Sequence, residues 1–127
     1  MAGGHEASGI VVKTGKKVTD FKEGDLVATG YEGCGSCSAC RNGAVDQCVD
    51  LHKDTEDGYK WGFFGFSDYC VRSVRGIYKV DGSVDPSEAG FVEPLATVLH
   101  GTKKLRLKPF ETVVVIGGGT MGLINAQ

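Results

Sequence analysis

The chain has 127 residues, 41% hydrophobic and 24% charged, so it has enough apolar side chains for a buried core and is not disordered as a whole. The formal net charge of −2 excludes the basic excess of nucleic-acid-binding proteins, and no apolar run approaches the ~20 residues of a membrane-spanning helix. The first residues lack the charged and apolar regions of a secretory signal, so we expect a cytoplasmic protein with reduced thiols.

The first two thirds of the chain have the pattern of short β-strands separated by glycine turns. Residues 8–15 are rich in β-branched side chains, and residues 17–30 predict a short strand, a turn and a second strand over 26–29. Segments 64–73 and 76–80 return to strand character. We therefore expect a fold that is mainly β with some α.

Four of the five cysteines follow the spacing C-x2-C-x2-C-x7-C, as Cys34, Cys37, Cys40 and Cys48. Disulfides are the poorest explanation in a reducing compartment. Bacterial iron–sulfur proteins use a shorter last gap followed by proline, whereas Val49 follows here. Tetrahedral zinc accepts four thiolates, and a closed thiolate shell is typical of a structural site. The spacing therefore favours structural zinc.

Three other features of this region have simpler interpretations. Cys70 stands alone in a strand-like stretch and is expected to be a small buried hydrophobic residue. The acidic patch at 50–57, which includes His52 and Lys53, is expected to be a solvated loop. The aromatic run at 59–69 either lines an apolar substrate channel or belongs to the core, and the core is favoured.

The last third changes to helical patterns. Asp85 is a good N-cap and Pro86 suits the first helical position. We expect this helix to be interrupted at Pro94, to resume over 95–105, and to end before Pro109.

A glycine-rich turn follows. Residues 112–116 predict a buried strand that runs into GGGTMG at 117–122, which fits G-x-G-x-x-G between a strand and a helix. In a dinucleotide-binding fold such a turn lets a pyrophosphate approach the helix N-terminus. The acidic partner expected about 20 residues further on would lie beyond Gln127.

Four more residues are candidates for chemistry. His5 and Glu6 are flanked by glycines, and a His-Glu pair is more often a surface pair than a metal site. Glu93 lies in an otherwise apolar helical segment, where a carboxylate is costly unless it is paired or bound to metal. His100 lies about two helical turns further on, on the same face, and is more simply a packed or hydrogen-bonded helix residue.

Together these motifs resemble the zinc-containing medium-chain dehydrogenases, the alcohol, polyol and threonine dehydrogenase family. The resemblance follows the family's order and rests on GHEASGIVVKTGKKV, FKEGDLVA, CGSCSACRNGAVDQC, EPLATVLHG and VVVIGGGTMG. It implies a partly open, GroES-like β-barrel over 1–84, with a structural-zinc lobe at about 31–59. A connecting helical segment over 85–108 and the first strand and helix start of a Rossmann domain over 109–127 would follow.

The resemblance also implies site residues. His5 would bind a catalytic zinc, Glu6 would be a neighbouring ligand or carboxylate, and Glu93 would be another ligand, as in the polyol and threonine branches. Thr97 would face the nicotinamide of NAD or NADP. The glycine turn would hold the cofactor's phosphates through Gly117, Gly119 and Gly122.

The implied function is oxidation of a small primary or secondary alcohol or polyol by hydride transfer, in a parent protein that is a homo-oligomer, with neither nucleic acid nor membrane as a partner. The family's upstream cysteine ligand and most of its nucleotide domain have no counterpart here. We therefore expect a truncated middle fragment that is inactive alone. The alternative is a self-sufficient four-cysteine zinc module that joins a partner protein.

Overall fold

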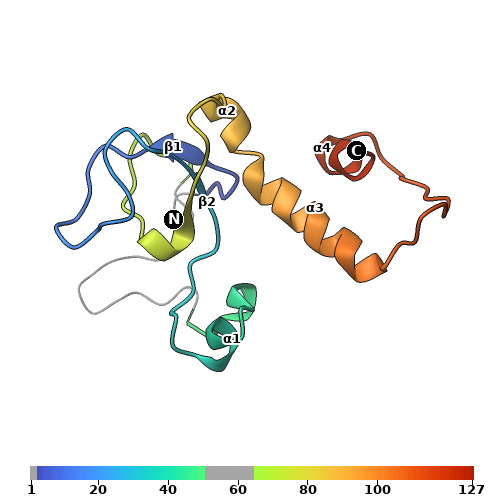
Figure 1. Cartoon of the computed structure of the whole chain (residues 1–127), viewed down its shortest axis with the longest axis horizontal. Coiled ribbons are helices and arrows are strands. Elements are labelled where there is room, and N and C mark those ends of the chain that lie inside the picture. Colours follow the sequence, from blue (N-terminus) through green and yellow to red (C-terminus); the bar gives the residue numbers. More distant parts are fainter. Residues whose placement is uncertain (1–2, 51–64) are drawn as a thin grey trace.

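A computed structural model describes residues 3–50 and 65–127. A small antiparallel sheet forms one part of the molecule, the cysteine-containing lobe lies beside it, and a long helix leads away to the C-terminal residues (Figure 1). In the described part of the chain, no helix is both long enough and apolar enough to cross a bilayer.

The sheet has three strands in the order β1-β2-β3: β1 (Ser8–Ile10), β2 (Leu26–Thr29) and β3 (Ile77–Lys79). In the central strand β2, Val27 pairs with Gly9 of β1 on one side and with Lys79 of β3 on the other. Its residues 26–28 are buried, which the predicted strand at 26–29 anticipated. The strand predicted at 8–15 is shorter: β1 ends at Ile10, and the last backbone hydrogen bonds to the neighbouring segment are those of Val11 with Asp25 and Gly24.

The sheet does not close into a barrel within the described residues. The strand character expected at 64–73 does not produce a ladder strand in the described part, residues 65–73. Instead, the backbone N–H groups of Gly65 and Phe66 donate to the carbonyls of Gly4 and Gly3 at 2.9 and 3.1 Å. This segment therefore lies beside the N-terminal residues as irregular backbone.

Two expectations about side chains in this region are wrong. Cys70 is exposed instead of buried, and residues 65–73, on which it lies, form no ladder with the other described residues. The described aromatic residues of the run at 59–69 are also exposed instead of forming core. They are Phe66 and Tyr69. Residues 51–64, which hold most of the acidic patch with His52 and Lys53 and the rest of the aromatic run, lie outside the described residues.

Helices α2 (Pro86–Ala89) and α3 (Val92–Leu105) follow the sheet. The Asp85 side chain caps α2 as expected, accepting a 2.8 Å hydrogen bond from the Ser87 backbone N–H. The predicted interruption at Pro94 is wrong, because Pro94 lies in the first turn of α3, where a missing N–H breaks no helical hydrogen bond. The break comes before Val92. Arg106, in the left-handed conformation, ends α3.

The prediction of a strand at 112–116 is also wrong. These residues form no ladder, and the side chains of Val114 and Ile116 are largely exposed. The chain then enters α4 (Thr120–Asn125), which packs against α3 (Figure 1). A strand needs hydrogen-bonding neighbours, and the described residues supply none for this segment.

Candidate metal centres

The four spaced cysteines come together in the lobe that follows β2. Cys37 is the N-cap of the short helix α1 (Ser38–Arg41), and its sulfur accepts from the Cys40 backbone N–H. Cys48 follows the 3-10 helix η1 (Val45–Gln47) and is buried. Gly35 and Gly43 have φ angles of +76° and +78°, a conformation that glycine adopts without a Cβ penalty. Local turns therefore bring all four thiols to one place.

The distances between these sulfurs fit a tetrahedral metal site. All four Sγ atoms lie within 4.8 Å of one another, and those of Cys37 and Cys48 are 3.9 Å apart. Sulfurs bound to one zinc at about 2.3 Å lie about 3.8 Å apart, whereas a disulfide bond is only about 2.05 Å long. The cluster fits zinc and is not a disulfide network.

Hydrogen-bond donors favour the thiolate form of Cys34, whereas burial and the neighbouring thiols oppose it at Cys40. The Ser36 hydroxyl, at 3.4 Å, and the Cys37 and Ser36 backbone N–H groups donate to the Cys34 sulfur and lower its pKa to about 6. A backbone hydrogen bond from Gly35 lowers the pKa of Cys40, but burial and the neighbouring thiols outweigh it and raise that pKa to about 12. Four adjacent thiolates repel one another, so a bound dication would complete the site.

A second cluster forms between distant parts of the chain. His5, Glu6 and Glu93 each offer a ligand atom, and these atoms lie within 4.8 Å of one another. The His5 Nε2 is 3.9 Å from Oε2 of Glu93, close to the separation of about 3.4 Å between nitrogen and oxygen ligands on one tetrahedral zinc. The His5 side chain is half exposed and that of Glu93 is 14% exposed. Three ligands with an open fourth position are typical of catalytic zinc.

Both halves of this cluster are held by specific contacts. Glu93 lies in the first turn of α3, and α3 packs against β2. His5 and Glu6 lie just before β1, and the Ser8 hydroxyl, at the start of β1, donates to the carbonyl of Pro86 at the start of α2. This bond ties the strand that follows Glu6 to α2, the helix that precedes α3.

Of the two other candidates on α3, Thr97 lies beside the second cluster and His100 does not. The Thr97 hydroxyl lies 3.4 Å from Oε1 of Glu93, one helical turn away on α3. Thr97 thus contacts the cluster itself. His100 is exposed and is not part of either ligand group among the described residues.

The glycine turn at 117–122 begins α4 as expected. Gly117 has a φ of +110°, and Gly119 is the N-cap of α4. A Cβ on Gly122 would overlap the carbonyl oxygen of Gly117, so the last glycine of the motif permits the tight approach of turn and helix. Residues 117–121 are exposed and Gly122 is half-buried.

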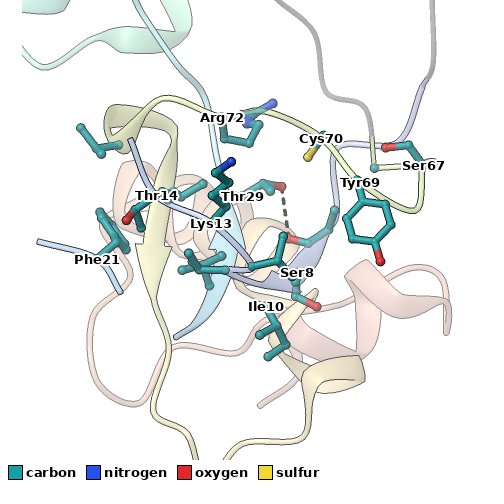
Figure 2. A pocket seen from close by; sticks show the side chains of 18 of the residues that line it. Ser8, Ile10, Lys13, Thr14, Phe21, Thr29, Ser67, Tyr69, Cys70 and Arg72 are labelled. Atoms are coloured by element: carbon teal, nitrogen blue, oxygen red, sulfur yellow. Dashed lines mark hydrogen bonds between the residues drawn. The ribbon is translucent and has the colours of Figure 1, made fainter. Parts of the chain in front are cut away.

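A cavity of about 730 Å³ lies beside the sheet, between β1 and the irregular segment that carries Tyr69 and Cys70 (Figure 2). Its lining includes Thr29, whose hydroxyl bond to a backbone carbonyl is dashed in Figure 2. Among the described residues, none of the candidate metal ligands lines it. The sequence did not identify Thr29 or Ser8 as functional residues. Each hydroxyl donates to a backbone carbonyl that is distant in sequence, and no residue pattern predicts such a hydrogen bond.

Comparisons with known proteins find one matching family and a set of similar dehydrogenases. The family model described as "Alcohol dehydrogenase GroES-like domain" matches residues 1–82. L-galactonate-5-dehydrogenase of Escherichia coli K12 is 35% identical over 126 residues, covering 94% of this chain and 34% of that protein. Sorbitol dehydrogenase of Halalkalibacterium halodurans is also 35% identical over 126 residues, covering 98% of this chain and 36% of that protein.

A solved structure is similar over the same region. Galactitol-1-phosphate dehydrogenase from Escherichia coli superposes with a TM-score of 0.80 at 28% identity, covering 98% of this chain and 35% of that chain. The chain thus spans about a third of the length of the relatives it matches.

Proposed function

Because the chain belongs to the alcohol dehydrogenase GroES-like domain family, we propose that it is the metal-binding part of a zinc- and NAD(P)-dependent dehydrogenase acting on an alcohol or polyol. The observation that carries the proposal is the convergence within 4.8 Å of His5 and Glu6 with Glu93, which is more than 80 residues away along the chain. A stand-alone four-cysteine module would have no use for this second cluster. The sugar-acid and polyol dehydrogenases among the relatives support a polyhydroxylated substrate.

The two clusters would have different roles. The closed four-cysteine shell would hold a structural zinc, and His5, Glu6 and Glu93 would hold a catalytic one. Zinc at the second site would supply Lewis-acid polarisation of the substrate oxygen, while a nicotinamide cofactor accepts hydride. Thr97 would face that cofactor, and Gly117, Gly119 and Gly122 would cradle its phosphates.

The proposal divides the chain into three parts. Residues 1–84 form the GroES-like part, 85–108 connect it, and 109–127 begin the nucleotide-binding part. The family match over residues 1–82 and the position of α3 support this division. The proposed location is the cytoplasm, because a zinc site made of four cysteines needs thiols that are kept reduced.

This chain assayed alone is proposed to be inactive. The segment that leads into the glycine turn has no strand partner among the described residues, and residues 117–121 of the turn are exposed. A cofactor would therefore meet only part of its binding surface.

Zinc titration tests the proposal. The chain is first saturated at its tight site, and further zinc is then titrated in competition with a chromophoric chelator. We expect a second, weaker equivalent that disappears in His5→Ala and in Glu93→Ala and remains in the exposed control His100→Ala. A second equivalent that survives in both ligand variants would contradict the proposed site.

A further inference from the structure

We propose that the Thr29 hydroxyl is a positioning group for the His5–Glu6–Glu93 cluster, because it clamps the backbone that carries His5. The inference rests on the proposed function of that cluster. Thr29 is the last residue of β2, and it touches the ligand-bearing segment with both its backbone and its side chain.

The segment that carries His5 and Glu6 lies outside regular structure. It precedes β1, so no strand ladder fixes the backbone of these two residues. On one side, the carbonyl of Gly4 accepts from the Gly65 backbone N–H. On the other side lies Thr29. The direction in which the imidazole of His5 leaves the backbone therefore depends on such individual contacts.

Thr29 makes three hydrogen bonds to this segment. Its backbone N–H donates to the carbonyl of Ala7 at 2.8 Å. Its hydroxyl lies 3.1 Å from the carbonyls of both His5 and Ala7, so a single proton is shared between two acceptors (Figure 2 dashes the bond to the second). The hydroxyl thus spans Glu6 and fixes the carbonyls on either side of it.

This clamp acts where metal geometry is most demanding. Metal–ligand distances must fall within about 0.2 Å of their ideal values, so a small rotation of the His5 backbone would move Nε2 out of range of a metal shared with Glu93. The 3.9 Å separation of Nε2 and Oε2 shows that the two groups already face each other. Groups that orient metal ligands typically contribute a factor of about 10–100 in metal affinity.

Two substitutions separate the hydroxyl from the rest of the side chain. Thr29→Val keeps the β-branched shape and the backbone N–H but removes the donor, whereas Thr29→Ser keeps the donor and removes the methyl group. Zinc affinity of the second site is measured by chelator competition with the four-cysteine site already filled. We expect Thr29→Val to weaken the second zinc about tenfold and Thr29→Ser to retain it within about twofold.

A metal-free measurement accompanies the titration. Thr29→Val should shift the carbonyl ¹³C resonance of His5, and Thr29→Ser should leave it near its original position. In both variants the affinity of the four-cysteine site should be unchanged, which shows that the fold is intact.

The outcomes distinguish this inference from the proposed function. If His5→Ala loses the second zinc but Thr29→Val binds it as tightly as the unmodified chain, the positioning role is wrong and the ligand set stands. Equal weakening in Thr29→Val and Thr29→Ser, or loss of the four-cysteine site in Thr29→Val, also overturns the positioning role. If the unmodified chain binds no second zinc, the ligand set and the inference both fail.

Discussion

The backbone of Gly33 lies directly against the sulfur of Cys40. A Cβ added at Gly33 would overlap Sγ of Cys40 and would come within 2.9 Å of Cγ1 of Val45. Gly33 itself is buried, so neither neighbour can turn out to solvent easily. The four-cysteine cluster therefore depends on the absence of a side chain one residue before its first ligand.

Gly33→Ala should consequently weaken zinc binding at this cluster. Overpacking a well-packed position costs about 1–3 kcal/mol, and that cost would appear as a loss of about 10–100-fold in zinc affinity. Gly82→Ala is the matched control, because a Cβ at Gly82 meets nothing within 4 Å. Chelator competition measures both variants. Equal affinities would show that Cys40 can move aside without loss.

The four-cysteine cluster is expected to hold one zinc tightly. Its ligands are local in sequence, so they form the site without help from distant elements. Metal analysis after dialysis should give about one zinc per chain, and Cys40→Ala should lose it. Cys70→Ala, which removes the exposed cysteine outside the cluster, should keep it. A brown protein that contains iron would disprove the assignment.

Local patterns predicted the parts of this molecule that depend on local geometry. The cysteine spacing identified the cluster, since short turns alone bring its sulfurs together. The apolar run at 26–29 identified β2, whose residues are buried between two neighbours. Asp85 was recognised as a helix cap because its side chain accepts a hydrogen bond from Ser87, only two residues further along the chain.

The errors concern residues whose environment depends on distant partners. The β-branched run at 112–116 has strand propensity, but a strand also needs neighbours to accept its hydrogen bonds. Cys70 was expected to be buried because its stretch also has strand propensity, but that stretch forms no ladder among the described residues. His5 and Glu93 were candidates from their sequence surroundings and from the family resemblance, but their proximity follows from the packing of α2 against β1 and of α3 against β2.

Acid should weaken the fold through Asp25, the buried carboxylate at the start of β2. Its pKa is held well below the usual range by hydrogen bonds from the side chain of Lys22, from Lys79 and from the backbone of Lys22. A lowered pKa means that the carboxylate stabilises the folded state fully above its unfolded pKa of about 3.9, and that this contribution is lost as the pH falls below that value.

Asp25→Asn isolates this contribution, since it keeps the side-chain size and removes the charge. Thermal unfolding should show the variant less stable than the unmodified chain near pH 6, and the difference should shrink below about pH 4. Asp81→Asn is a useful comparison, because the pKa of Asp81 is also lowered, but by hydrogen bonds from Ser83 instead of from lysine. A difference for Asp25→Asn that stays constant down to about pH 2 would contradict the assignment.

The apolar segment at 112–116 should cause copies of this chain to associate. Val114 and Ile116 are 79% and 95% exposed, and the segment forms no ladder with any described residue. Unpaired backbone groups beside β-branched side chains favour strand pairing between molecules. Val114→Lys places a charge in the middle of the segment and should lower the apparent mass in light scattering, while zinc at the four-cysteine cluster is unchanged. Val12→Lys, at another exposed valine outside the segment, should leave association as it is. The explanation fails if the unmodified chain is strictly monomeric and the amides of 112–116 are nevertheless protected from hydrogen exchange.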